Sequence, residues 1–303
     1  MAELYDSATH QDPRDIEELP ASVNTYHYTN MDDYLRIILS ERQRLYRSFP
    51  ATSGSDEKRQ DEQTEGTQTD HIIFIIEPLT FAHDFLNSES QRPFHDKLSF
   101  DPNRHILVVK MPCKAHEQLA VAFDDMLKIS LQPMGLHRAI FSWHSTTLTA
   151  QDGSIKEADG GWSPRRPPRG ALKRPSVILE VASSETAAKL RLDAHYWVDP
   201  ARGQANIAIG VKVHVKKPHI TIEVWEWDDR FSRPTRTQYL AITKSDEKIR
   251  FDPNPNPQIM IPFHLLFRRP AENIRERDIV FATQDLVEFA TMVWDMEFDY
   301  EQE

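Results

Sequence analysis

Two carboxylates in the middle of the sequence have the residue types and the setting for chemistry. Asp159 follows "GSIKEA" and precedes two glycines, and Glu180 interrupts the apolar run "PSVILEVA". A carboxylate inside a buried strand costs free energy unless a cation, a set of hydrogen-bond donors or a metal satisfies it. Glu180 is therefore the residue whose surroundings tell most about function.

A lysine on a second apolar run is the candidate partner of Glu180. Side chains alternate along a strand, so Glu180 lies on the opposite face from Leu179 and Val181. In "ANIAIGVKVHV", the same alternation places Lys212 on one face with two small residues, Ala208 and Gly210. If the two strands are neighbours, Lys212 comes within reach of Glu180 and the small residues leave room there. The competing interpretation of Lys212 is an ordinary lysine on an edge strand or on the surface.

At this point the sequence resembles a known group. The segments "KEAD" and "ILEVA", with twenty residues between Asp159 and Glu180, resemble the restriction-endonuclease-like PD-(D/E)XK superfamily, in particular fungal members. In those members the second acid lies in an "E-V-x-x-S-E" context and is followed by a helix with "L-x-x-D-A-x-x-W". The resemblance covers about 115 to 227 and rests on Glu180, Val181, Ser184, Glu185, Leu190, Asp193, Ala194 and Trp197.

The resemblance implies a fold and a site. The fold is an α/β (α+β) domain with a central mixed sheet, flanking helices and a restriction-endonuclease-like core. In the site, Asp159 and Glu180 bind Mg²⁺, or Mn²⁺, which generates the nucleophile that attacks a phosphodiester. The superfamily has a lysine two residues after the second acid, but Ala182 stands there. Lys212 is the preferred substitute, and Lys189 is a second candidate that is equally well explained as an exposed helix residue.

Each of these acids also has an ordinary structural interpretation. Asp159 is a common residue type in a turn beside glycine, and Glu180 is explained as a paired carboxylate on an exposed strand face. Glu117 is a candidate third acid, but an acidic residue in the first turn of a helix is also favoured by the helix dipole. His214 and His219 lack a third ligand at metal spacing, so a zinc site is not expected.

A basic segment lies between the two carboxylates. The sequence "RRPPRGALKR" is called the basic loop below, and its charges come from Arg165, Arg166, Arg169, Lys173 and Arg174. Such a run is usually only a solvated loop. Because the net charge is -11, contact with DNA or RNA would have to be local, and the basic loop is the candidate clamp on a phosphate backbone.

The function classes follow from these residues. The first is a metal-dependent phosphodiesterase acting on nucleic acid, with full or weakened chemistry. The alternative is a non-catalytic interaction module with a nuclease-like fold, in which the carboxylates form structural ion pairs. The missing lysine and the negative charge favour the module, whereas the basic loop and the spacing of Asp159 and Glu180 favour the enzyme.

The surrounding elements give the expected organisation. Residues 1–22 are predicted to be a disordered acidic tail, 23–112 an N-terminal region with an acidic loop at 53–70, 113–296 the nuclease-like core and 297–303 an acidic tail. Periodic apolar residues predict helices after Asn30, from 115 to 131, after the 175–182 strand and over 277–296. Asp152-Gly153 predicts a hairpin.

Composition restricts the setting. The chain has 303 residues and 39% hydrophobic residues, enough for a folded core. A single cysteine, Cys113, excludes an intrachain disulfide, and we expect an inert thiol there. The absence of a secretory signal and of a long apolar segment predicts an intracellular protein, in the cytoplasm or nucleus, without a membrane partner.

Overall fold

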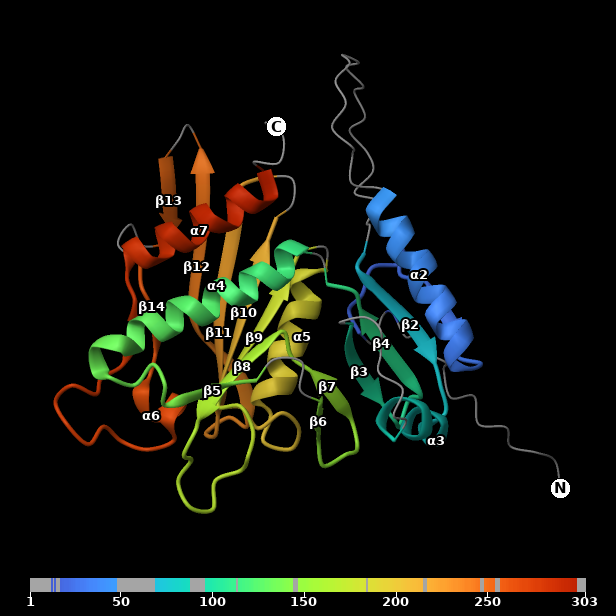
Figure 1. The fold of residues 1–303 in the computed structure, drawn as a ribbon, viewed down its shortest axis with the longest axis horizontal. Helices are drawn as coiled ribbons and strands as arrows, with labels where there is room; N and C mark the ends of the chain where they lie inside the picture. The colour runs from blue at the N-terminus through green and yellow to red at the C-terminus, as the bar shows by residue number, and fades with distance from the viewer. Residues whose placement is uncertain are drawn as a thin grey trace, which may run out of the picture.

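The fold was analysed in a computed structural model, in which two β-sheets lie side by side, each with its own helices (Figure 1). The structure describes residues 12, 14, 17–47, 69–87, 96–112, 114–143, 147–183, 185–214, 217–245, 248–253 and 257–298. The predictions for 1–11, for nearly all of the acidic loop 53–70, for Cys113 and for 299–303 lie outside the described residues.

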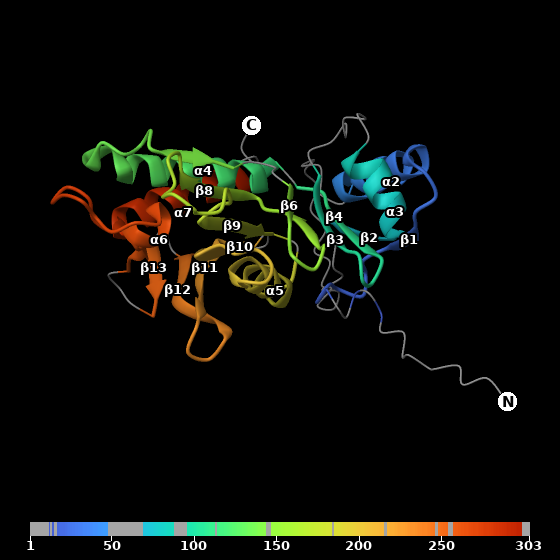
Figure 2. The same ribbon diagram turned by 90° about the horizontal axis from the view of Figure 1, so that it is seen from below.

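The smaller sheet has six strands in the order β1-β2-β4-β3-β7-β6. β1 and β2 are parallel and the remaining pairs are antiparallel, so this sheet is mixed. Helices α2 and α3 cover its outer side (Figures 1 and 2). The bounds are β1 Thr25–His27, α2 Met31–Arg47, β2 His71–Ile75, α3 Pro78–Phe81, η1 Ala82–Leu86, β3 Lys97–Asp101, β4 Ile106–Lys110, β6 Thr147–Thr149 and β7 Ile155–Glu157.

The larger sheet has seven strands in the order β13-β12-β11-β10-β9-β8-β5. β9 and β10 are parallel, and their neighbours are antiparallel. The prediction of a mixed α+β fold with flanking helices is therefore confirmed. The bounds are β5 Ile140–Ser142, β8 Gly160–Pro164, β9 Val177–Ala182, β10 Ile207–Val213, β11 His219–Asp228, β12 Arg233–Ser245 and β13 Lys248–Asp252.

Helices sandwich the larger sheet. Figures 1 and 2 show α4 and α7 on one face and α5 on the other. Buried apolar residues of α4, α7 and the sheet form the largest core cluster, as the periodicity of α4 predicts. The bounds are α4 Lys114–Leu131, η2 Gln132–Met134, α5 Ala187–Val198, β14 Ile259–Ile261, α6 Phe263–Phe267, β15 Ile279–Phe281 and α7 Thr283–Phe298.

Strand β9 lies at the centre of the larger sheet, and every residue in it is buried. The prediction that β9 and β10 are neighbours is confirmed, with Glu180 beside Gly210 and Ala182 beside Lys212. The room that Gly210 leaves is filled by α5, because a Cβ on this glycine would lie 3.1 Å from the side chain of Leu190. The face of β9 that carries Glu180 therefore packs against a helix, and the interpretation of Glu180 as an exposed strand residue is wrong.

The predicted Asp152-Gly153 hairpin forms, with β6 and β7 as its strands and Gly153 at φ 80°. Its place in the fold differs from the expectation, because β7 pairs with β3 of the smaller sheet. The predicted boundary between 112 and 113 therefore does not separate the two sheets. The hairpin brings Lys156 and Asp159 to the junction between them.

Two further expectations need correction. Residues 17–22 do not behave as a free tail, since Leu19 is only 7% exposed and packs beside the smaller sheet. The last predicted helix is shorter than expected, because Ile279–Phe281 form strand β15 against β14 before α7 begins at Thr283. Asn30 caps α2 as predicted, its Oδ1 accepting from the Asp33 N–H at 2.9 Å.

Candidate functional site

A cluster of buried ionisable side chains fills the junction between the two sheets. Strand ends of both sheets, α4 and α5 all contribute to it, and each member is less than a tenth exposed. Perturbed ionisable groups concentrate at functional sites, although structural ion-pair networks also perturb them. The charged cluster, as it is called below, comprises Asp70, His71, Lys97, Lys110, His116, Lys156, Glu157, Asp159, Glu180, Glu185, Lys189 and Asp193.

Asp159 immediately precedes β8 and is held by three donors on one oxygen. Its Oδ2 accepts from Lys110 Nζ at 2.9 Å and from the Val181 N–H at 2.8 Å, and it lies 3.1 Å from His116 Nε2. Its Oδ1 is buried and accepts no hydrogen bond from the described residues. Burial alone would raise the pKa of Asp159, but the charges of His116 and Lys110 outweigh it and hold the pKa well below the usual value. Asp159 is therefore ionised.

Glu180 lies close to Asp159 but faces the α5 layer. Trp197 Nε1, on α5, donates a hydrogen bond to Glu180 Oε1. Burial raises the pKa of Glu180 well above its usual value, and the negative charge of Asp159 raises it further. The two carboxyl groups thus differ in state, because the surroundings favour the ionised form of Asp159 and the protonated form of Glu180.

Lys110, at the end of β4, supplies the cation for this junction. Its ammonium group donates to Asp159 Oδ2 at 2.9 Å and to the Val181 carbonyl at 2.6 Å, and it lies 3.7 Å from Glu185 Oε1. Burial alone would lower the pKa of Lys110, but the surrounding carboxylates raise it well above its usual value. The lysine is therefore charged and fixed between a carboxylate and a carbonyl.

His71 is a second buried cation. Its Nδ1 lies 2.7 Å from Asp70 Oδ1, and its Nε2 lies 3.2 Å from Glu185 Oε2. Burial alone would lower its pKa, but the two carboxylates raise it to about 9. Glu185 precedes α5 inside the charged cluster, and Thr186 caps the helix.

The part of the charged cluster next to α5 is a closed set of ion pairs. Asp193 Oδ1 accepts from Lys156 Nζ at 2.6 Å and from Lys189 Nζ at 2.7 Å. Lys189 also lies 3.0 Å from Glu17 Oε2 and is only 1% exposed, so its interpretation as a surface residue is wrong. Its charge is used to neutralise Asp193 and Glu17.

Lys212 does not take the place predicted for it. Its backbone lies beside Ala182, where the superfamily lysine would stand. Its ammonium group, however, donates to the Glu185 carbonyl at 2.5 Å, and no ion pair to Asp159 or Glu180 is found among the described residues. Burial lowers its pKa. The lysine that contacts the first acid is Lys110, from the other sheet.

The arrangement does not offer a divalent cation an oxygen cage. Magnesium requires several oxygen ligands in octahedral geometry. Within the described residues, no group of three or more His, Cys, Asp or Glu side chains could hold a metal ion. Two oxygens that could serve, Asp159 Oδ2 and the Val181 carbonyl, hold the Lys110 ammonium group, and Glu180 is tied to Trp197. The binding of Mg²⁺ or Mn²⁺ therefore stays a prediction, and the arrangement of these side chains does not fit it.

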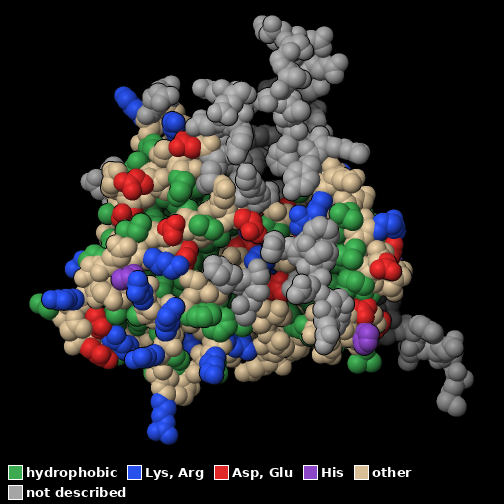
Figure 3. Space-filling view, in the orientation of Figure 1, with side chains coloured by type: hydrophobic (Ala, Val, Ile, Leu, Met, Phe, Trp, Pro, Cys, Tyr) green, Lys and Arg blue, Asp and Glu red, His purple; other side chains and the backbone are tan. Residues whose placement is uncertain are grey.

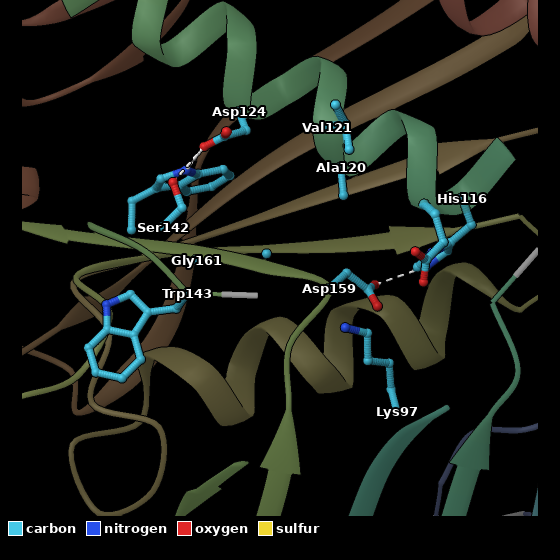
Figure 4. A pocket seen from close by; sticks show the side chains of 12 residues that line it. Lys97, His116, Ala120, Val121, Asp124, Ser142, Trp143, Asp159 and Gly161 are labelled. Atoms are coloured by element: carbon cyan, nitrogen blue, oxygen red, sulfur yellow. Dashed lines mark hydrogen bonds and ion pairs between the residues drawn. The ribbon is translucent and has the colours of Figure 1, made fainter. Parts of the chain in front are cut away.

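A small cavity of about 120 Å³ borders Asp159 on the α4 side (Figure 4). Figure 4 shows the Lys97 ammonium group pointing toward the Asp159 carboxylate, with His116 on its other side. The cavity extends along the β8 backbone to Ser142, whose hydroxyl donates to Asp124 Oδ1 at 2.8 Å. Glu117, the candidate third acid, lines this cavity, and no contact between Glu117 and Glu180 is found among the described residues.

The basic loop lies at the opposite end of the β8–β9 hairpin from the carboxylates. Gly160 pairs with Leu179 and Trp162 with Val177, so Asp159 and Glu180 stand at the open end of the hairpin and the loop closes the other end. The six residue steps along β8 from Asp159 to Arg165, the start of the basic loop, span about 20 Å at about 3.3 Å per residue. Arg174 donates to the carbonyls of Thr149 and Arg202, whereas the exposed charges of the loop are Arg165, Arg166, Arg169 and Lys173.

Sequence reasoning missed Lys110, His116 and Trp197 as partners of the two acids. The signal for Lys110 was the same as for Glu180, namely a charged residue at the end of an otherwise apolar strand, "HILVVK". His116 carried no comparable signal, since a histidine in the first turn of a helix is unremarkable until the helix is placed.

Similarity to known proteins is found in structure and not in sequence. No family model matches the sequence, and no curated protein matches it. Among solved structures, the chain is similar to a protein described as a "putative nuclease belonging to DUF820" from Anabaena variabilis ATCC 29413. The similarity covers 69% of this chain and 97% of the other, with 12% identity and a TM-score of 0.40. In the described part of this chain, no helix combines the length and apolarity needed to span a bilayer.

Proposed function

We propose that this protein is a non-catalytic nucleic-acid-binding module with a nuclease-like core, in which a lysine takes the place that a metal ion would need. The single observation that carries the proposal is the Lys110 ammonium group, held between Asp159 Oδ2 and the Val181 carbonyl. An ion pair of this kind neutralises the buried carboxylate without any ligand.

Electrostatics supports the same conclusion. Two unit charges 4 Å apart interact by about 4 kcal/mol at an effective dielectric constant of about 20, and a divalent ion doubles this figure. A metal ion at Asp159 would meet Lys110, with Lys97 and His116 close by. Ala182 removes the lysine that the superfamily resemblance calls for, which supports a core without the cutting reaction.

The surface supports a binding role. Figure 3 shows Lys and Arg side chains gathered at the lower left of the face, over the region where Figure 1 places β5 and the loops after β8 and α6. The exposed residues there include Arg165, Arg166, Arg169, Lys173 and Arg275. In a chain of net charge -11, this local concentration of cations is the surface that suits a phosphate backbone.

The test measures binding and cleavage on the same molecules. Fluorescently labelled DNA and RNA oligonucleotides, single-stranded and duplex, are incubated with the protein in EDTA and in Mg²⁺ or Mn²⁺. We expect binding that falls with salt, equal in EDTA and Mg²⁺, and no shortening of the strands. Failure to bind any of these oligonucleotides at low salt would overturn the proposal.

The second candidate function is the metal-dependent phosphodiesterase. The observation that favours it is Asp159 Oδ1, which is buried, has no hydrogen-bond partner among the described residues and belongs to a residue that lines the cavity beside α4. Cleavage that requires Mg²⁺ or Mn²⁺ and disappears in both Asp159→Asn and Glu180→Gln would establish this function and refute the non-catalytic one.

A further inference from the structure

The outer face of the β5–β8 ribbon, at the edge of the larger sheet, presents the exposed Phe141 beside the basic loop. β5 is the edge strand and pairs only with β8 within the described sheet, with Phe141 opposite Ser163 and Ile140 opposite Pro164. Side chains alternate between the faces of a strand. Ile140 and Trp162 lie in the core on the α4 side, so Phe141, Trp143 and Ser163 lie on the other face.

Two aromatic side chains occupy this face. Phe141 is 49% exposed, and its ring centroid lies 5.3 Å from that of Trp143 in an edge-to-face arrangement. The Trp143 indole is fixed, because Nε1 donates to the Ser163 hydroxyl at 2.7 Å. Figure 4 shows this indole on the other side of β8 from Asp124 and Ser142. The exposed Phe141 ring and the half-buried, hydrogen-bonded Trp143 indole together form an aromatic platform at the sheet edge.

The same ribbon carries the start of the basic loop. Arg165 N–H donates to the Ala139 carbonyl at 2.8 Å, which extends the β5–β8 pairing by one residue. By alternation Arg165 follows Ser163 on the aromatic face; its Nε donates to the Ile140 carbonyl at 3.3 Å, and the residue is exposed. Arg166 and Arg169 continue the positive charge into the loop. Aromatic rings and arginines are thus adjacent on one surface.

We infer that the outer face of the β5–β8 ribbon binds single-stranded nucleic acid, with unpaired bases stacked on Phe141 and Trp143 and the backbone phosphates on the basic loop. This inference rests on the proposed function and specifies its ligand. Positive grooves with aromatic side chains are the common means of binding single strands, because every base has a face that stacks. A duplex keeps its bases stacked on each other and offers only its phosphates to such a surface.

The test compares Phe141→Ala with a matched aromatic control. Phe231 is 58% exposed, in the turn between β11 and β12, so Phe231→Ala removes an equally accessible ring from a different surface. The probes are oligo-dT and oligo-rU of about 16 nucleotides, with a duplex of the same length, and the readout is fluorescence anisotropy. We expect Phe141→Ala to weaken binding of the single strands about tenfold, and Phe231→Ala to leave it unchanged. A preference for oligo-dT or for oligo-rU then identifies the nucleic acid.

Several results would overturn the inference and leave the proposed function standing. In the first, Phe141→Ala binds single strands with unchanged affinity, while the double variant Arg166→Ala with Arg169→Ala binds them more weakly. In the second, the duplex binds as tightly as the single strands. If the native protein is an oligomer in solution and Phe141→Ala lowers its molar mass, the face is instead an interface between copies of the chain. Absence of binding to all probes would remove both the inference and the proposed function.

Discussion

The charged cluster and the basic loop hold charges in opposite ways. In the charged cluster, Lys110, Lys189 and His71 are each surrounded by carboxylates and shielded from water. In the basic loop, Arg166 and Arg169 are exposed. The first region satisfies its charges internally, whereas the second presents charges that a ligand can neutralise.

This difference distinguishes charged residues that stabilise the fold from charged residues that can bind a ligand. Perturbed pKa values mark the charged cluster as unusual, but an internally paired network has little left to offer a ligand. The exposed loop has the chemistry to bind a polyanion. Burial therefore argues for a structural role at the junction of the sheets, and exposure argues for a binding role at the sheet edge.

Removal of Lys110 should give the largest effect. In Lys110→Met the side chain keeps its apolar length but leaves Asp159 as an unpaired buried charge. We expect the free energy of unfolding in urea to fall by about 3–5 kcal/mol. Lys248→Met, on the exposed edge strand β13, is the matched control and should change it by less than about 0.5 kcal/mol. A loss below about 1 kcal/mol in Lys110→Met would show that the cluster does not depend on this cation.

His71 makes the charged cluster sensitive to alkaline pH. Its pKa rises from 6.5 to about 9 on folding, so its contribution is complete below pH 6.5 and is lost as pH rises through about 9. The contribution lost is about 3 kcal/mol. Urea unfolding of the native protein and of His71→Gln, measured at intervals from pH 6 to pH 10, should therefore converge at high pH. The exposed His27→Gln serves as control, and parallel curves for His71→Gln and the native protein would contradict the assignment.

Substitutions in the basic loop should weaken nucleic-acid binding and leave the free energy of unfolding unchanged. Arg166→Ala with Arg169→Ala removes two exposed charges and should weaken oligonucleotide binding about tenfold, with a smaller dependence of affinity on salt. Lys248→Ala with Arg250→Ala removes the same charge from β13, at the far edge of the larger sheet. Equal loss of affinity in both double variants would mean that net charge, and not the loop, sets the binding.

Glu180 should give the smallest effect. Because its surroundings favour the protonated acid, Glu180→Gln replaces a neutral group by one of similar shape that still accepts from Trp197. We expect the free energy of unfolding at pH 7 to change by less than about 1 kcal/mol. Asp159→Asn should cost more, since it removes a charge that Lys110 requires. Greater destabilisation by Glu180→Gln than by Asp159→Asn would reverse the protonation states given to the two acids.

The surroundings of Glu180 could be predicted from the sequence. Alternation along β9 and β10 predicted which residues share its face, and a helix was correctly predicted after β9. The contacts of Lys212 could not be predicted, because strand register gives the position of its backbone but not the direction of its long, flexible side chain. The role of Lys110 could not be predicted either, because this residue lies 71 residues before Val181 and contacts it only through the packing of the two sheets.

The basic loop shows a different kind of error. Its position between Asp159 and Glu180 in sequence suggested proximity to both. In an antiparallel hairpin, however, the connecting loop lies at the end opposite the free strand ends, so β8 and β9 carry the loop away from the acids. This consequence of hairpin geometry could have been drawn once β8 and β9 were taken as neighbours.

The most direct test of the central claim is a calorimetric titration of the native protein and of Asp159→Asn with Mn²⁺ and Mg²⁺. If the Lys110 ammonium group takes the place of a metal ion, neither cation binds in a way that depends on Asp159, and the two proteins give the same isotherms. A binding event of the native protein that Asp159→Asn abolishes would contradict the account and return the two carboxylates to a metal site.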